Sequence, residues 1–284
     1  VRFEQLDLCR ILLVLKPRPM KRLVALMMCA VSLGAAAQLP DYVPTDGLVG
    51  WWPLDGDAVE NNGSGIDGIV FGAQPTMNRF GNEYMALSFD GSSYVKINSD
   101  FDYPKRSVSL WAKAYANEFG LIYDCDYPGL DHGLTQFGFG AFGQTIGIGV
   151  GHPGGSNTLN VDSNLNQWYL LTFSRDSDST KYFINGVLEH VVANGNATSS
   201  FGSTGTWIGT RVNAQNRFFQ GSIDDIGIWN RAITEEEVLA LFNAIGPIEG
   251  CTDAGACNFN EEAVLDDGSC VSCDFIATFC GVGT

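Results

Sequence analysis

Positive charge is scarce in this sequence. It holds 16 Lys and Arg against 32 Asp and Glu, which gives a formal net charge of -16 at pH 7. Residues 1–37 contain six of the basic residues but only two of the acids, so the net negative charge of the rest of the chain is larger than that of the whole sequence. Such a surface repels nucleic-acid phosphates and anionic lipid. The composition therefore argues against nucleic acid and membrane surfaces as partners, and leaves cations and neutral ligands such as sugars.

Histidine is also scarce, and the residues of common hydrolytic sites are absent. The three histidines have no zinc-like spacing to another His or Cys. The sequence shows neither a serine elbow nor a Cys-His pair, so it offers no candidate nucleophile. The histidines are His132, His152 and His190.

Helical periodicity is absent before residue 234. From Leu48 to Asn230, short runs alternate apolar and polar residues and are separated by Gly, Asn and Asp. Asn185-Gly186 lies between apolar flanks, which predicts a type I′ hairpin. Many short strands with turn signals predict an all-β sandwich or jelly roll. Runs of this kind are Ser107–Lys113, Trp168–Ser174 and Gly221–Trp229.

One short helix is expected at the end of this region, over residues 234–245. Its apolar residues recur at the spacing of one helical face. Thr234 and Glu237 form a capping box, in which each side chain bonds the other residue's backbone amide. Glu235–Glu237 also oppose the positive end of the helix dipole, so these acids need no catalytic explanation. The residues of the apolar face are Val238, Leu241, Phe242 and Ile245.

The strongest targeting signal lies near the N-terminus, at Met20–Gln38 (MKRLVALMMCAVSLGAAAQ). Two basic residues are followed by the apolar stretch Leu23–Leu33 and by small residues up to Ala37. This order is typical of a secretory signal peptide, and the apolar stretch is too short to span a bilayer. We expect residues 20–37 to be a signal peptide and residues 1–19 a non-native leader. The mature chain would then be secreted or held at the cell surface.

Cysteine is rare in the sandwich region and concentrated in the residues that follow it in the sequence. Cys125 would be either a free thiol or the partner of an odd cysteine in the tail. Residues 250–284 are too few to bury a sufficient core, so we expect disulfide bonds to hold them together. The candidates, whose pairing stays open, are Cys251, Cys257, Cys270, Cys273 and Cys280.

Six short motifs follow one another through the sandwich region. They are GLVGWWPLDG (47–56), FDGSSYV (89–95), SLW (109–111), YFING (182–186), WIG (207–209) and GSIDDIGIWNRAI (221–233). In this order they resemble the laminin-G-like, concanavalin-A-like jelly roll, in its bacterial, pentraxin-related form. The resemblance implies two antiparallel sheets face to face over residues 40–246, with the final helix at one edge.

The tail resembles a second family. GCTDAGACNFN (250–260) and DDGSC (266–270) are similar to the short Cys- and Asp-rich repeats of Bacteroidetes surface proteins. We expect residues 250–284 to be one such module, cut short at Thr284.

The laminin-G-like resemblance also implies a structural calcium ion, which many members of the family bind. The first loop, LDGDAVENNGSGIDG (54–68), is rich in the oxygen ligands that Ca²⁺ prefers. A regular strand would bury Asp224, which then needs either a cation or a bulge at Asp224-Asp225. We expect Asp57, Glu60 and Asp224 to hold one structural calcium, and Asp225 to accept bonds from backbone amides.

Binding rather than catalysis is what the resemblance implies. Glucanase relatives carry Glu-x-Asp-x-x-Glu on one strand, and no such strand occurs here. In the loop Tyr123–His132, aromatic and polar side chains suit a sugar ligand, so we expect Tyr127, Asp131 and His132 to bind it. The prediction is a non-catalytic module that recognises carbohydrate or a surface glycoprotein in adhesion. The alternatives are a structural spacer of a large adhesin, and a glycoside hydrolase or lyase.

Overall fold

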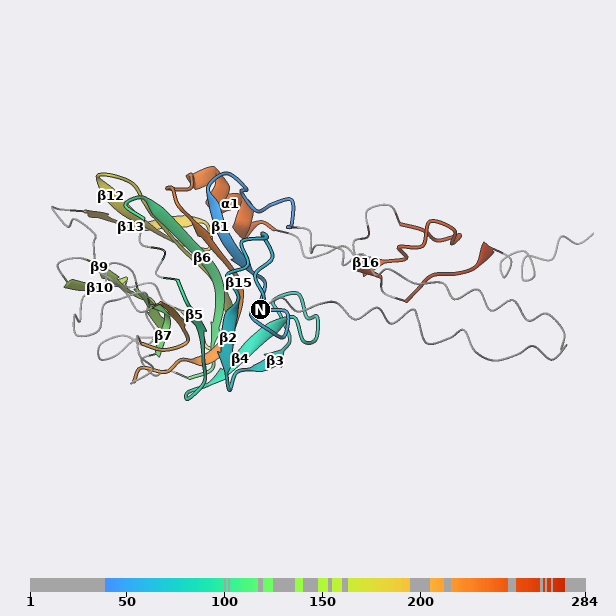
Figure 1. Ribbon diagram of the computed structural model, residues 1–284, viewed down its shortest axis with the longest axis horizontal. Coiled ribbons are helices and arrows are strands. Elements are labelled where there is room, and N and C mark those ends of the chain that lie inside the picture. The colour runs from blue at the N-terminus through green and yellow to red at the C-terminus, as the bar shows by residue number, and fades with distance from the viewer. Residues whose placement is uncertain are drawn as a thin grey trace, which may run out of the picture. The chain divides into compact units, whose positions relative to one another are not determined.

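The computed structural model describes residues 39–99, 101, 103–116, 120–124, 136–139, 148–152, 155–159, 163–194, 205–211, 216–244, 249–260, 263, 265–266 and 268–273. Within these ranges the predicted fold class is confirmed. Two antiparallel sheets pack face to face (Figure 1). The one short helix, which the family resemblance placed at an edge, packs on the outer face of the larger sheet. The signal peptide and leader predicted for residues 1–37 lie outside the described residues.

The larger, eight-stranded sheet has the strand order β13-β12-β11-β6-β15-β4-β3, and β1 pairs with β15 in addition. Neighbours such as β6 and β15 are far apart in sequence, as expected for a jelly roll. The strands are β1 (Leu48–Trp52), β3 (Gln74–Thr76), β4 (Ala86–Asp90), β6 (Arg106–Ala114), β11 (Trp168–Arg175), β12 (Ser179–Ile184), β13 (Val187–Ala193) and β15 (Gln220–Trp229).

The smaller, seven-stranded sheet has the order β10-β9-β8-β7-β14-β5-β2. Its strands are β2 (Gly68–Phe71), β5 (Tyr94–Ile97), β7 (Gly120–Asp124), β8 (Gln136–Phe139), β9 (Ile148–His152), β10 (Gly155–Leu159) and β14 (Thr206–Ile208).

Two apolar clusters hold the sandwich together. The inner core fills the space between the sheets and includes Leu110, Phe173 and Ile208. The outer core lies on the other face of the eight-stranded sheet, where Trp111 and Trp229 pack with residues from the helix and from the N-terminal segment. Full burial of one large apolar side chain contributes about 1.5–3 kcal/mol. Part of the eight-stranded sheet is therefore covered on both of its faces.

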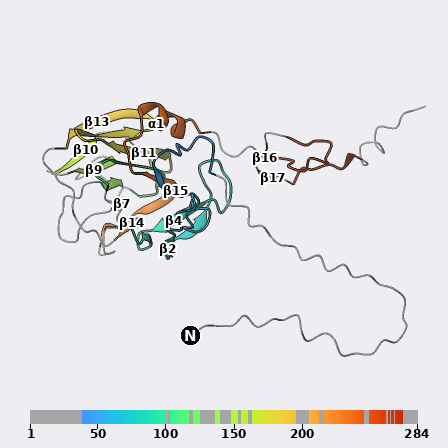
Figure 2. The same ribbon diagram turned by 45° about the horizontal axis from the view of Figure 1, so that its top comes forward.

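The predicted helix and hairpin are both confirmed. Helix α1 (Glu235–Phe242) begins with the expected capping box, in which Thr234 Oγ1 accepts from the Glu237 amide. Asn185 and Gly186 join β12 to β13 with φ values of 51° and 79°, as a type I′ turn requires. A side chain at Gly186 would meet α1, so this turn and α1 lie side by side (Figure 2).

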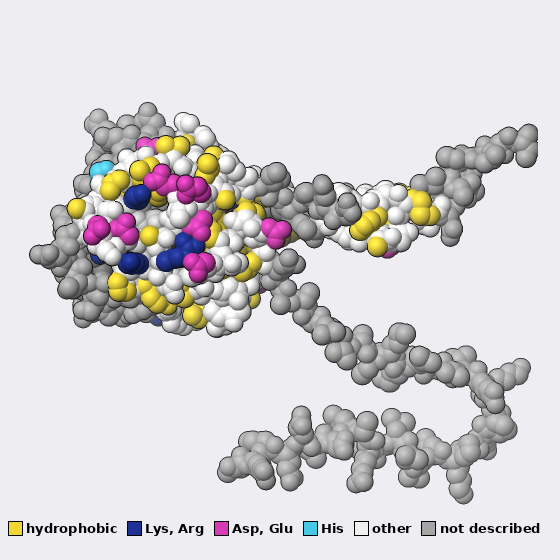
Figure 3. All heavy atoms as spheres, turned by 90° about the horizontal axis from the view of Figure 1, so that it is seen from above, with side chains coloured by type: hydrophobic (Ala, Val, Ile, Leu, Met, Phe, Trp, Pro, Cys, Tyr) yellow, Lys and Arg dark blue, Asp and Glu magenta, His cyan; other side chains and the backbone are white. Residues whose placement is uncertain are grey.

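Charged side chains of both signs lie near α1. Lys181 Nζ is 2.9 Å from Glu235, and Arg231 pairs with Glu237. Seen from above, this side of the sandwich shows acidic and basic side chains next to one another, with hydrophobic side chains between them (Figure 3).

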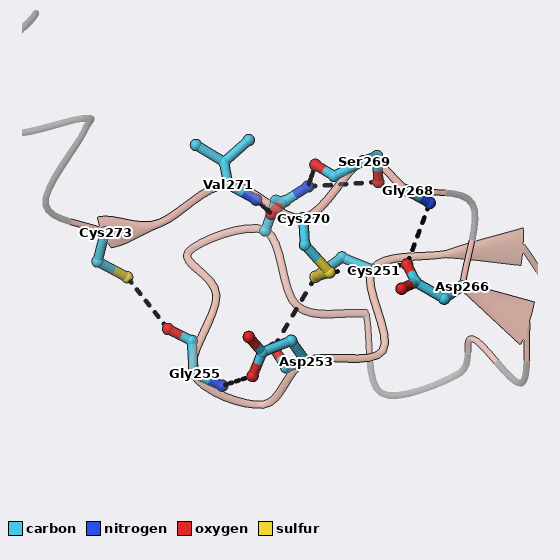
Figure 4. Close-up of a disulfide and its surroundings, with 10 residues drawn as sticks. Cys251, Asp253, Gly255, Asp266, Gly268, Ser269, Cys270, Val271 and Cys273 are labelled. Atoms are coloured by element: carbon cyan, nitrogen blue, oxygen red, sulfur yellow. Dashed lines mark hydrogen bonds between the residues drawn. A yellow bond between two sulfur atoms is a disulfide. The ribbon is translucent and has the colours of Figure 1, made fainter.

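The tail is disulfide-bonded, as predicted. One disulfide joins Cys251 to Cys270 (Figure 4), and a second joins Cys257 to Cys273. Strand β16 (Glu249–Gly250) pairs in parallel with β17 (Leu265–Asp266). The tail aspartates close turns, since Asp253 and Asp266 accept from the amides two residues further on. Cys125 and Cys280, the other two cysteines that follow the predicted signal peptide, lie outside the described residues.

Candidate functional site

The three predicted calcium ligands lie in two different settings. Glu60, in the first loop, is only 7% exposed. Its carboxylate accepts from the amides of Trp51 (3.0 Å), Asn62 (2.6 Å) and Ser64 (2.8 Å), and from the Ser64 hydroxyl. Asp57 is exposed, and its Oδ1 accepts from the Val59 amide at 2.9 Å. Both acids therefore shape the loop through backbone amides.

Asp224 has a different partner from the other two. The pairing of β15 with β6 shifts register between Asp224 and Gly227, and Asp225 has φ 46°, so the bulge that the sequence suggested is present. Asp224 nevertheless stays buried, at 2% exposure. Arg79 Nη1 donates to Asp224 at 3.0 Å and to Asp225 at 2.5 Å. The nearby cation is therefore an arginine.

Arg79 lies in the turn between β3 and β4. It was not among the site residues predicted from the sequence. Its guanidinium stacks on Phe80 and Trp111, with 4.1 and 4.9 Å to the ring centroids. The Tyr42 hydroxyl donates to Asp225 at 3.4 Å, where a backbone amide was expected. We call Tyr42, Arg79, Asp224 and Asp225 the Arg79 cluster. The cluster ties the N-terminal segment and the β3–β4 turn to the last strand of the sandwich.

The Arg79 cluster holds more acid than base. Burial raises the pKa of Asp224 well above its ordinary value, and the charge of Asp225 adds to this, while Arg79 opposes it. Asp55 lies close enough for the charge of Asp225 to affect its pKa. Although it is partly exposed, desolvation and then the charges of Asp225 and Asp57 raise its pKa to about 6. In the described part of the chain, no three His, Cys, Asp or Glu side chains are placed to hold a metal ion. The calcium site stays a prediction.

The predicted sugar ligands, Tyr127, Asp131 and His132, lie outside the described residues. The structure instead points to a group of aromatic side chains on the outer face of the seven-stranded sheet. Phe71 on β2 lies opposite Tyr94 on β5, and Trp207 on β14 lies opposite Lys96. Residues opposite one another in a ladder share a face. The residues next to these along the same strands face the inner core: Val70, Val95 and Ile208.

These rings contact one another. Phe71 and Tyr94 are stacked, with centroids 4.5 Å apart and an angle of 16° between their planes. Trp207 lies 5.5 Å and Phe218 lies 6.4 Å from Tyr94. Phe71 is 41% exposed, and Tyr94 and Phe218 are half-buried. We call Phe71, Tyr94, Trp207 and Phe218 the aromatic patch.

A polar border accompanies the aromatic patch. Lys96 Nζ lies 5.1 Å from the Trp207 ring centroid, in the range of a cation–π contact. Exposed apolar surface next to polar groups marks interaction sites on protein surfaces. The alternation in GIVF and YVKI predicts which side chains share a face, but not that β2, β5 and β14 are neighbours. Sequence reasoning therefore missed the patch.

Known proteins with a similar fold include several that act on or bind carbohydrate. Domain 4 of AbnA, a GH43 extracellular arabinanase from Geobacillus stearothermophilus in complex with arabinotriose, is 20% identical with a TM-score of 0.54, over 69% of this chain and 98% of that one. A Trypanosoma rangeli sialidase mutant with trans-sialidase activity is 13% identical with a TM-score of 0.58, over 70% of this chain.

The structural match to the sialidase covers only 33% of the sialidase chain. The receptor-binding domain of botulinum neurotoxin C/D mosaic serotype is 15% identical with a TM-score of 0.52, over 69% of this chain and 51% of that one. These likenesses show the fold alone. No curated protein sequence matches the chain.

A family model gives the firmer result. The model described as "Concanavalin A-like lectin/glucanases superfamily" matches residues 89–239, which run from the end of β4 into α1. This range contains the bulged strand β15 and most of the strands of both sheets. It agrees with the laminin-G-like resemblance of the sequence motifs. The chain belongs to the concanavalin A-like lectin/glucanase superfamily.

Proposed function

We propose that the protein is an extracellular, non-catalytic module that binds carbohydrate at the aromatic patch. The observation that carries the proposal is the stacked pair of Phe71 and Tyr94, partly exposed on a sheet face beside Lys96. Sugar rings present apolar C–H faces that pack on aromatic rings, while their hydroxyls bond polar neighbours. The arabinanase domain in complex with arabinotriose shares this fold and supports the choice of ligand class.

Four buried or clustered carboxylates of the described residues are engaged in structural contacts, which supports binding over hydrolysis. A glycosidase needs two acids facing the scissile bond. Glu60 is occupied by backbone amides, and Asp224 and Asp225 share Arg79. Glu237 closes the capping box of α1. These acids therefore have structural partners. The hydrolase alternative predicts turnover of a polysaccharide that Asp224→Asn abolishes, and a reducing-sugar assay measures it.

Disulfides support an extracellular location, since they persist in oxidising compartments. None of the helices in the described part of the chain is long and apolar enough to cross a membrane. The disulfide-bonded tail also favours the second candidate, a spacer within a larger adhesin. A spacer would bind no glycan, so the same binding experiment separates the two.

A glycan array with purified protein tests the proposal. Phe71→Ala/Tyr94→Ala removes the stacked pair and should weaken binding to any recognised glycan about tenfold or more, as expected for the loss of about 1.5 kcal/mol or more. Val187→Ala/Val191→Ala is the matched control, because it removes two exposed apolar side chains, at 59% and 49%, from β13. Thermal melts confirm that each variant is folded. Unchanged array binding by the patch variant would contradict the proposed site.

A further inference from the structure

A second row of side chains lies on the opposite side of the sandwich, on the outer face of the eight-stranded sheet. Trp168 on β11 pairs with Lys113 on β6, which pairs with Ser222 on β15. Ser222 pairs with Ser88 on β4, which pairs with Gln74 on β3. Because opposite residues share a face, the five side chains form one straight row. We call this row the open strip.

The open strip faces away from the inner core. The residues next to it along the same strands point inward and are buried there: Leu87, Ala112, Tyr169 and Ile223. Two residues from Lys113 on the same face, Trp111 lies in the outer core under the helix and the N-terminal segment. Gln74 is exposed, Trp168, Lys113 and Ser88 are half-buried, and Ser222 in the middle of the row is buried, with its hydroxyl bonded to Tyr115. The same sheet face is thus apolar where it is covered and polar where it is open.

The length of the open strip suits a chain of sugars. Neighbouring strands are about 4.8 Å apart, so a row over five strands is roughly 19 Å long. An indole ring stands at one end, and the accessible hydroxyl and amide groups, those of Ser88 and Gln74, lie on the last two strands of the row. This combination of an aromatic face and hydrogen-bonding groups is what a carbohydrate surface requires.

Lys113 gives the open strip its charge. Its Nζ lies 4.9 Å from the Trp168 ring centroid and 5.5 Å from that of Tyr115. The Tyr115 hydroxyl is 2.5 Å from Ser222 Oγ, so the ring is held beside the row. Among the described residues Lys113 has no carboxylate within ion-pair distance, although the protein holds twice as many acids as bases. A half-buried ammonium between two rings favours an anion from outside the chain.

We propose that the open strip is a second binding surface, whose ligand is a polysaccharide that carries carboxylate groups. Lys113 binds a sugar carboxylate, the next sugar packs on Trp168, and Ser88 and Gln74 bond hydroxyls further along the row. The excess acid elsewhere on the protein repels such a polymer, so binding depends on this one cation and is weakened by salt. The site does not depend on the aromatic patch, which lies on the other sheet.

Affinity electrophoresis in gels that contain polygalacturonate tests the proposal, with fully methyl-esterified polygalacturonate as the neutral probe. The protein should be retarded by the acid form and not by the ester. Lys113→Gln should weaken the retardation at least about tenfold, the value of a charged hydrogen bond. Lys105→Gln changes the net charge equally at an exposed position just before β6 and should leave the retardation unchanged.

Three results would overturn the second surface: no retardation by polygalacturonate, equal retardation by the ester, or wild-type behaviour of Lys113→Gln. Phe71→Ala/Tyr94→Ala separates the two proposals in the same gels. It should leave uronate binding intact even if it abolishes binding on the glycan array. Loss of uronate binding in that variant would move the ligand to the aromatic patch and contradict the open strip. Thermal melts again control for folding.

Discussion

The first loop and the last strand of the sandwich bury a carboxylate in different ways. Glu60, in the first loop, accepts four hydrogen bonds, one from the Trp51 amide on β1 and three from amides and a hydroxyl of its own loop. Asp224, in the last strand, depends on one guanidinium from a residue far away in sequence. The first arrangement is local and uses neutral donors. The second is long-range, and burial, followed by the charges of neighbouring acids, raises the pKa of Asp224. The difference predicts different responses to mutation and to pH.

The largest effect is expected for Arg79→Met. It leaves Asp224 and Asp225 without their cation, and breaking a buried pair from one side costs about 3–5 kcal/mol. Urea unfolding at pH 7 measures the loss. The control is Lys181→Met, whose ion pair with Glu235 is exposed and is expected to contribute less than about 1 kcal/mol. Equal losses in the two variants would show that the Arg79 cluster has no special role.

The effect of calcium on stability is the next test of how the first loop and the last strand hold their carboxylates. For one ion to use Asp57, Glu60 and Asp224, Asp224 would have to exchange Arg79 for the ion. Calcium at a hundredfold excess over Kd would then add about 2.7 kcal/mol of stability, and Asp224→Asn would lose that gain. Melting temperatures with calcium and with chelator measure it. Identical values in wild type would exclude a calcium ion at both the first loop and the last strand.

Glu60→Gln tests the local arrangement. One carboxylate oxygen becomes an amide nitrogen, which cannot accept the bonds from the Ser64 amide and hydroxyl or those from Trp51 and Asn62, depending on its orientation. Hydrogen bonds to a charged group contribute about 1.5–3 kcal/mol, so we expect a loss of about 2 kcal/mol. Denaturant unfolding at pH 7 checks it, and a loss below ~0.5 kcal/mol would contradict this account of the loop.

The smallest effect, with the opposite sign, is expected for Asp55→Asn. The pKa of Asp55 is about 6 in the folded protein and near 3.8 when unperturbed, so the folded state binds the proton more tightly. The stability from this group is present below pH 3.8 and is lost as pH rises through 6. The variant should therefore melt higher than wild type at pH 7.5, with a smaller gain at pH 4.5. A gain that is the same at both pH values would exclude titration of Asp55.

Local patterns were predictable from the sequence, and long-range partners were not. The capping box, the Asn185-Gly186 turn and the disulfide-bonded tail depend on residues close together in the chain. The bulge followed from the conflict between strand alternation and the charge of Asp224. Arg79, the partner of Asp224, could not be identified, because only the strand order of the whole sheet brings the turn between β3 and β4 close to the last strand.

Both proposed surfaces have the same origin. Lys113 and Trp168 lie in runs that the sequence marks as strands, and so do Tyr94 and Lys96. Alternation indicates that each side chain shares a face with the residues two positions away. It does not indicate which strand lies beside it. The rows that join Trp168 to Gln74 and Phe71 to Tyr94 appear only once the register between strands is known.

The interlaced disulfides of the tail have a mechanical consequence. An unfolded chain under tension lengthens by roughly 3.3–3.6 Å per residue. Between Cys251 and Cys270 the pulling force would instead pass through the disulfide, which holds the two Cα atoms 4.7 Å apart. Only the few residues from Cys270 to Cys273 could then extend along the direction of pull. Under load, the segment from Cys251 to Cys273 would act as a short link of almost constant length.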